Sequence, residues 1–228
     1  MSPLIDRMLQ PSISIRFQFL FVALLLMLAA PSVLPDALVG LVLPALFTVL
    51  VLTALATVAE SRRTLIVGLV LALPAIVIHW IAPVGQVSLA GEISGDLFLI
   101  WVTIAILHHV VRSERVTTDV LFAVASVYLL LALIWAMAYG IADGMQPGTL
   151  RYPEVLLGLA DDPSTRGLYT YFSFVTLTTL GYGDITPVTD AGRLLAMLEA
   201  TLGQLFLVII VARLVGMHSA QGMARMRE

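Results

Sequence analysis

The feature that most constrains the fold is a run of 23 residues, Ala37–Ala59, without a single charged side chain. A helix needs about 20 apolar residues to cross a hydrocarbon core about 30 Å thick, so this run predicts a membrane span. Five further apolar segments, separated by charges or by glycine and proline, complete a predicted set of six. The spans are Phe17–Leu34, Ala37–Ala59, Thr64–Ala82, Asp96–Val111, Val120–Ala142 and Ala191–Gly216. The sequence therefore predicts an all-α membrane protein.

Composition excludes several other classes of protein. Of the 228 residues, 60% are hydrophobic and 12% are charged, whereas a soluble domain carries roughly 25% charged residues. The net charge of −3 and the lack of a basic cluster exclude nucleic-acid binding. The chain has no cysteine, which excludes disulfides and thiolate metal sites. Because catalytic triads, metal-ligand clusters and phosphate loops are also missing, we expect neither an enzyme nor a cofactor.

Arginine sets the predicted orientation, since the chain has no lysine. Arginines occur before the first span, after the second, after the fourth and after the sixth, at Arg7, Arg16, Arg62, Arg63, Arg112, Arg115, Arg225 and Arg227. The positive-inside rule then predicts a multi-pass cell-membrane protein with both termini in the cytoplasm, and the alanine and leucine content suggests a bacterial inner membrane. The first span also resembles a signal peptide, and its cleavage would leave five spans.

The connection between the last two spans, Asp143–Asp190, is too long and too apolar to be a simple turn. Its first part is loop-like, with one short helical candidate at Pro153–Ala160. Its second part, Leu168–Thr179, is an apolar run of 12 residues, which is too short to cross a bilayer. Such a segment is expected to be re-entrant, which is tolerated only where protein or a water-filled cavity surrounds it.

Directly after the re-entrant segment the chain reads Thr178-Thr179-Leu180-Gly181-Tyr182-Gly183-Asp184. The two glycines permit backbone conformations that other residues resist. A strand of this kind can point successive carbonyls toward one axis, and four strands would form stacked oxygen rings that replace the hydration shell of K+. Leu180 and Tyr182 are expected to point away from that axis and to hold the strand in place.

The stretch Tyr171–Pro187 resembles the pore helix and selectivity filter of potassium channels, with a complete match to Thr-x-Gly-Tyr-Gly-Asp. The resemblance extends over Val120–Gly216 and implies passive, selective K+ conduction. It also implies a homotetramer, because one pore loop per chain needs four chains to close a ring. The other expected partners are membrane lipids and K+ itself.

The resemblance assigns roles to individual residues. The filter would consist of Thr179, Leu180, Gly181, Tyr182 and Gly183. K+ would be bound by the carbonyls of Thr179, Leu180, Gly181 and Tyr182 and by the Thr179 hydroxyl. Asp184 would lie at the outer mouth, where four copies concentrate cations. Thr178, Tyr171 and Val175 would support the filter. Gly203 matches the glycine hinge of the inner helix.

Four positions depart from the usual pattern of the family. Leu180 replaces a valine or isoleucine. Because this residue would bind the ion through its backbone carbonyl and not its side chain, we expect selectivity to survive. Tyr171 and Phe172 replace a tryptophan pair; the tyrosine can still form a hydrogen bond near the filter and the phenylalanine cannot. Val175 replaces a glutamate that some bacterial channels carry behind the filter, so behaviour that depends on that carboxyl is not expected.

The predicted organisation has five parts. They are a cytoplasmic leader (1–16), a peripheral four-helix domain (17–111), a cytoplasmic linker (112–119), a pore domain (120–216) and a short cytoplasmic tail (217–228). Within the pore domain we expect a turret at 143–167, the pore helix at 168–179 and the filter at 179–184. The fourth span contains no arginine, which excludes a voltage sensor driven by moving arginine charges.

A small number of residues could control the opening of the pore. Glu199 lies inside the sixth predicted span, and a carboxyl at that depth indicates a functional role. It is either a proton or gate sensor or an anchor bonded to the pore helix, for example to the hydroxyl of Thr176 or Thr178. Arg193 is expected to pair with an acid at the pore mouth. His108 and His109 lie near the cytoplasmic surface and can titrate near neutral pH.

Three alternative functions stay open at this point. The chain could be the pore subunit of an ion transporter, a membrane sensor with a vestigial pore, or a non-selective cation channel. Transporters with related filters usually retain a lone glycine, and non-selective relatives typically change the tyrosine or the second glycine. Because Gly181, Tyr182 and Gly183 are all present, a potassium-selective channel is the favoured function.

Overall fold

The computed structural model describes residues 16–34, 36–58, 62–81, 89–153 and 165–225. Within these ranges the chain is almost entirely helical. The helices are α2 (Arg16–Val33), α3 (Asp36–Val58), α4 (Arg62–Ile81), α5 (Leu89–Arg112), α6 (Thr118–Met145), α8 (Thr165–Leu177) and α9 (Asp190–Arg225). Two short strands, β1 (Leu150–Arg151) and β2 (Thr186–Pro187), pair antiparallel with Leu150 opposite Pro187.

The prediction of an all-α membrane protein is confirmed. Among the described residues, four helical stretches are long and apolar enough to cross a bilayer: Gly40–Val58, Leu89–Arg112, Thr118–Met145 and Asp190–Ser219. The stretch Arg16–Ala30 forms a shorter apolar helix. The six-span topology and the tetramer remain predictions.

Some element boundaries differ from the expected ones. Helix α5 starts at Leu89, seven residues before the predicted start at Asp96, because Glu92 falls in its first turn, where the helix dipole favours an acid. Helix α9 continues to Arg225, since a helix that leaves the membrane needs no apolar side chains. The candidate helix Pro153–Ala160 lies, beyond Pro153, outside the described residues.

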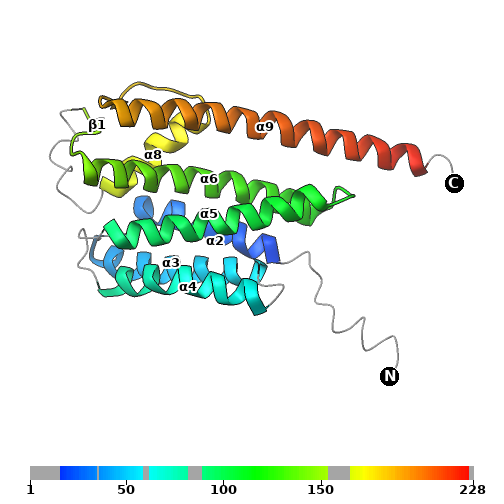
Figure 1. Cartoon of the computed structure of the whole chain (residues 1–228), viewed down its shortest axis with the longest axis horizontal. Helices are drawn as coiled ribbons and strands as arrows, with labels where there is room; N and C mark the ends of the chain where they lie inside the picture. The colour runs from blue at the N-terminus through cyan, green and yellow to red at the C-terminus, as the bar shows by residue number, and fades with distance from the viewer. Residues whose placement is uncertain (1–15, 35, 59–61, 82–88, 154–164, 226–228) are drawn as a thin grey trace.

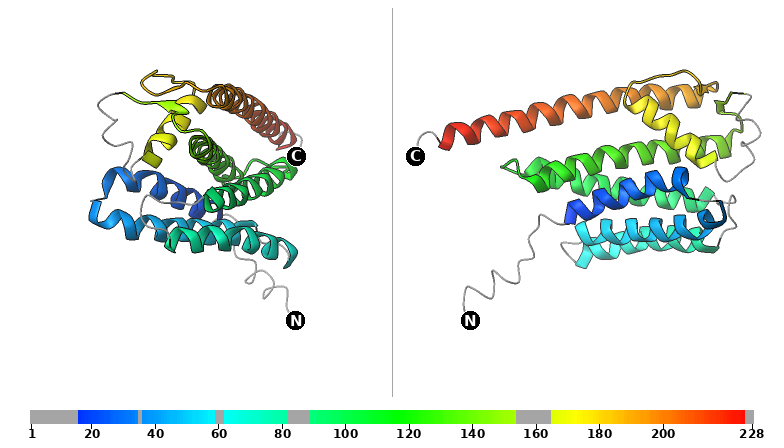
Figure 2. Two further views of the ribbon diagram at one scale, coloured as in Figure 1. Left: turned by 60° about the vertical axis from the view of Figure 1, so that its left-hand side comes forward. Right: turned by 180° about the vertical axis from the view of Figure 1, so that it is seen from behind.

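Helix α6 is the centre of the arrangement, because it contacts α2, α5, α8 and α9. Helices α2, α3 and α4 gather on one side of it and the long helix α9 on the other (Figures 1 and 2). The short helix α8 lies obliquely between α6 and α9, near the end where the chain turns from β2 into α9 (Figure 2). The start of α6 is fixed by Thr117, whose hydroxyl accepts the Val120 N–H at 3.3 Å.

Candidate functional site

The backbone after α8 has an alternating conformation over the predicted filter, residues 179–184. Thr179, Gly181 and Gly183 have positive φ values of 59°, 59° and 77°, whereas Leu180 and Tyr182 between them do not. Glycine adopts this region at little cost. Thr179 is β-branched and does not, so its conformation is strained, and strain of this kind persists only where the surroundings impose it.

The end of α8 holds the start of this segment. The carbonyl of Val175 accepts the backbone N–H groups of Leu180 at 2.9 Å and of Gly181 at 3.2 Å. The Thr179 N–H bonds the Thr176 carbonyl at 2.9 Å. Thr178 was expected to support the filter, and its hydroxyl bonds back to the Phe174 carbonyl at 2.6 Å. The helix terminus therefore satisfies its own free carbonyls and fixes the segment at the same time.

A side-chain bond fixes the other end of the segment. The Tyr171 hydroxyl donates to Asp184 Oδ2 at 2.7 Å, and the backbone N–H of Ile185 donates to Oδ1 at 3.0 Å. These bonds favour the charged form and lower the pKa of Asp184 below its ordinary value, with the Tyr171 bond as the main cause. Tyr171 therefore makes the bond near the filter that the sequence predicted, and Phe172 instead packs its ring edge-to-face against Tyr139.

The apolar side chains of the segment are not covered within one chain. Leu180 is 54% exposed and Tyr182 is 67% exposed. The packing expected for them therefore requires contacts from outside the chain. Thr178, Gly181 and Asp184 are also exposed.

Glu199 is completely buried and joins three helices. Its Oε2 accepts the Tyr139 hydroxyl of α6 at 2.6 Å, and its Oε1 lies 2.5 Å from the Ser173 hydroxyl of α8. A bond from Glu199 to a hydroxyl of this helix was one of the two roles expected for it, and the partner is Ser173 instead of Thr176 or Thr178. Ser173 lies one turn before Thr176, on the face of α8 that meets both α6 and α9.

Gly203 lies where α9 packs tightly against the end of α8. A Cβ at this position would stand 2.9 Å from the backbone oxygen of Leu177, so the glycine permits a close helix contact. Helix α9 is continuous through Gly203, and its proposed role as a hinge stays a prediction. The next residue, Gln204, places its side-chain Nε2 3.5 Å from the Thr179 hydroxyl.

The C-terminal part of α9, far from the predicted filter, is bonded to the end of α5. The Arg213 guanidinium donates to the Ser113 carbonyl at 3.1 Å and to the Val111 carbonyl. His109, one turn before, has its ring centroid 5.2 Å from that of Phe17 in α2. Arg193 pairs with Asp190 in the first turn of α9, at 3.7 Å and exposed to solvent, where such a pair contributes little.

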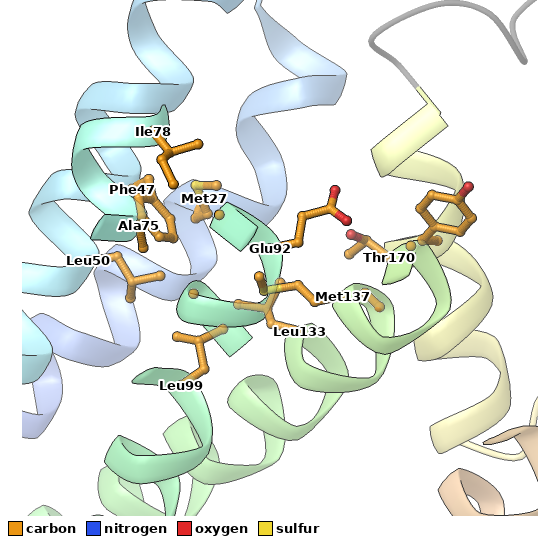
Figure 3. Close-up of a pocket in the computed structure, with 15 residues that line it drawn as sticks. Met27, Phe47, Leu50, Ala75, Ile78, Glu92, Leu99, Leu133, Met137 and Thr170 are labelled. Carbon is orange, nitrogen blue, oxygen red and sulfur yellow. The ribbon is translucent and has the colours of Figure 1, made fainter. Parts of the chain in front are cut away.

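A cavity of about 160 Å³ separates the N-terminal helices from the pore helix. Its wall is formed by α2, α3, α4, α5, α6 and α8 and is mostly apolar, with Leu99, Leu133 and Met137 among the lining residues. Figure 3 shows Glu92 of α5 and Thr170 of α8 at one end, turned toward each other.

Four residues of the site were not foreseen from the sequence: Tyr139, Ser173, Gln204 and Arg213. Each is a polar residue within an apolar helix, which is the only signal that the sequence carries. The hydrogen-bond partners of these residues could not be predicted from the sequence, because they lie between 25 and 102 positions away along the chain.

Comparison with known proteins identifies the class. A family model described as "Ion channel", named Ion_trans_2, matches residues 98–219. This match covers more than half of the chain, so the protein belongs to this family of ion channels. The family is defined by a two-span pore domain and is part of the potassium-channel superfamily. The match and the apolar helices together establish a membrane protein.

Two curated relatives are similar to the chain. Protein LctB of Bacillus caldotenax is 30% identical over 126 residues, which cover 55% of this chain and 89% of LctB. Protein LctB of Geobacillus stearothermophilus is 34% identical over 105 residues, which cover 45% of this chain and 75% of that protein. Their names do not describe an activity.

Proposed function

We propose that this ion channel conducts K+ selectively as a homotetramer, with residues 179–184 as the filter. The observation that carries the proposal is the alternating backbone of this segment, in which Thr179, Gly181 and Gly183 have positive φ. This alternation supports a backbone that turns successive carbonyls toward one side. Four such segments around an axis would supply the oxygen rings that replace water around K+.

The proposed ligands are backbone carbonyls, so most side chains of the filter only support it. The carbonyls of Thr179, Leu180, Gly181 and Tyr182 and the Thr179 hydroxyl would bind the ion. Asp184 would attract cations to the mouth, and its lowered pKa keeps it charged. The fixed ends at Val175 and Tyr171 support a preorganised filter, which does not have to be rebuilt for each ion.

The exposed face of α9 supports assembly from several chains. Large apolar side chains along this helix are exposed in the single chain, including Met197 at 62%, Val208 at 64% and Val215 at 60%. Surfaces of this kind mark contacts with lipid or protein. In the proposed tetramer they face neighbouring subunits and the central cavity, and Leu180 and Tyr182 pack against the neighbours.

The remaining organisation follows from this arrangement. Helices α2–α5 would surround the pore on the outside, in contact with lipid, in a multi-pass cell-membrane protein whose two termini lie in the cytoplasm. A pore gated by moving arginine charges is not proposed, because α5 carries its arginine only at its final position, Arg112.

Ion flux from liposomes that contain the purified chain tests the proposal. With K+ as the permeant cation we expect fast flux, and with Na+ in its place we expect flux close to that of empty liposomes. Equal fluxes of the two ions would contradict selectivity and favour a non-selective cation channel. If neither ion moves while the protein is a folded tetramer, the proposal of a K+ channel fails in favour of a vestigial pore or a transporter subunit.

A further inference from the structure

We infer that the Glu199 carboxyl carries a proton, and that this neutral carboxyl is a positioning residue that fixes the pore helix α8 between α6 and α9. The proton assignment holds whichever ion passes, whereas the positioning role rests on the proposed function. The assignment follows from counting the hydrogen atoms available around one serine.

Three short oxygen–oxygen contacts meet at this cluster. The Ser173 hydroxyl lies 2.7 Å from the Ala132 carbonyl and 2.5 Å from Glu199 Oε1, and the Tyr139 hydroxyl lies 2.6 Å from Glu199 Oε2. Each contact at these distances needs one hydrogen between its two oxygens. The cluster therefore needs three hydrogens.

The two hydroxyls supply only two of them. Ser173 has one hydrogen, and a backbone carbonyl such as that of Ala132 can only accept. With an ionised carboxylate, one of the two contacts of Ser173 would bring two oxygens together without a hydrogen. With a protonated carboxyl, Glu199 donates to Ser173, Ser173 donates to the Ala132 carbonyl and Tyr139 donates to Glu199. All three contacts are then satisfied.

The surroundings agree with a neutral group. Glu199, Ser173 and Tyr139 are each 0% exposed, and a buried charge without a partner is among the most costly features a protein can contain. In the part of the chain that the structure describes, the ion pair present joins Arg193 to Asp190, so Glu199 has no cationic partner there. The groups that face its carboxyl are hydroxyls from α6 and α8.

The chain of hydrogen bonds also connects α9 to the part of α8 that holds the filter. It runs from α9 through Ser173 to the backbone of α6. Ser173 lies two residues before Val175, whose carbonyl accepts the backbone N–H groups of Leu180 and Gly181. The Tyr139 ring packs against Phe172, the residue before Ser173. A neutral carboxyl can therefore lock α8 in position without placing a charge behind the filter.

Infrared difference spectroscopy of the full chain in liposomes at neutral pH tests the proton. The spectrum of the wild type minus that of Glu199→Gln is expected to contain the carbonyl stretching band of a protonated carboxylic acid. In Ser173→Ala the same band is expected to move to higher frequency, because the acid loses its acceptor. If the difference spectra of both variants contain only carboxylate bands, the assignment is overturned. Asp96→Asn, which alters a carboxyl in α5, is the matched control and should leave the Glu199 band in place.

Flux and tetramer stability test the positioning role. Glu199→Gln keeps a donor for Ser173 and an acceptor for Tyr139, so K+ flux is expected within about twofold of the wild type, with unchanged selectivity. Glu199→Ala removes both and is expected to lower flux roughly tenfold. Equal flux in the two variants would overturn the role. Loss of selectivity in the wild type itself would instead remove the proposed function and leave the infrared result standing.

Discussion

The two halves of the molecule satisfy their polar side chains in different ways. In the N-terminal helices α2–α5, the hydroxyls of Thr53, Thr57 and Thr103 bond to carbonyls three or four residues earlier on their own helix. Between those helices, contact is made mainly by apolar side chains such as Leu20, Leu50 and Phe98. A side-chain bond between helices does occur there, from Trp80 to Thr48 at 3.0 Å.

In the C-terminal half, α6–α9, several side-chain bonds run between helices, beside bonds within one helix such as that of the Thr201 hydroxyl to the Met197 carbonyl at 2.7 Å. Tyr139 and Ser173 reach Glu199, Tyr169 reaches Asp143 at 2.8 Å, and Tyr128 reaches the Leu177 carbonyl at 3.4 Å. Apolar packing tolerates small sliding movements, whereas directional bonds fix positions. The difference indicates that side-chain bonds position the helices around α8 more than they position α2–α5.

The largest effect is expected at the filter backbone. Gly181→Ala adds a side chain where φ is positive and should abolish K+ flux while the tetramer still forms, as measured in liposomes and on native gels. Gly148→Ala is the matched control, because Gly148 also has positive φ, 83°, and open space within 4 Å of where its Cβ would stand, but lies outside the filter. Flux that survives in Gly181→Ala, or that is lost equally in Gly148→Ala, would refute the assignment of the filter.

The next effect is expected at the bonded cluster around Glu199. Tyr139→Phe keeps the ring against Phe172 but removes the donor to Glu199 Oε2. We expect a loss of about 1–3 kcal/mol in the free energy of unfolding, the usual cost of leaving a buried acceptor unpaired. Denaturant titration of the protein in detergent measures it.

Tyr128→Phe is the matched control for that change, because its hydroxyl bond to the Leu177 carbonyl is longer, 3.4 Å. Its effect should be clearly smaller than that of Tyr139→Phe. Equal losses in the two variants would mean that the bond to Glu199 has no special weight.

A smaller, pH-dependent effect is expected at the outer mouth. The Tyr171 bond lowers the pKa of Asp184, so its stabilisation is complete above the ordinary carboxyl pKa of about 3.9 and disappears as the pH falls through the lowered value. In Tyr171→Phe, Asp184 should take up its proton at higher pH. A titration of K+ flux toward acid should then show the decline beginning at higher pH than in the wild type. Identical acid profiles would contradict this role for Tyr171.

The smallest effect is expected in the N-terminal helices. Thr57→Val removes a hydroxyl that bonds only to the Thr53 carbonyl of its own helix, at 2.7 Å. The change should cost at most about 0.5 kcal/mol of stability and leave flux unchanged. A loss as large as that of Tyr139→Phe would remove the contrast between the two halves.

The helices could be predicted because their signal is local. Four of the six predicted apolar runs lie in helices that are long and apolar enough to cross a bilayer. The motif at 179–184 predicts much of its own backbone, since glycines stand at two of its three positions with positive φ. Thr179 could not be recognised as the third, because its strain is imposed by contacts at the end of α8. The sequence places the start of this span at Asp96, because the acids Glu92 and Asp96 interrupt the apolar pattern, whereas α5 begins at Leu89.

The bonds between helices could not be predicted because they depend on register. Whether Glu199 meets Ser173, Thr176 or Thr178 depends on how α9 is rotated and shifted against α8, a matter of a single helical turn. The β1–β2 pair was missed for a similar reason, since each strand has two residues and its partner lies on the far side of the re-entrant segment. Arg213 and the end of α5 likewise meet only in the folded chain.

The central claim is that the alternating backbone of residues 179–184 selects K+. The most direct test is the reversal potential of the purified channel in a planar bilayer with K+ on one side and Na+ at equal concentration on the other. We expect a large potential whose sign shows K+ as the permeant ion, and the same potential in Glu199→Gln. A reversal potential at zero would mean that the two cations pass equally well, and would contradict the claim.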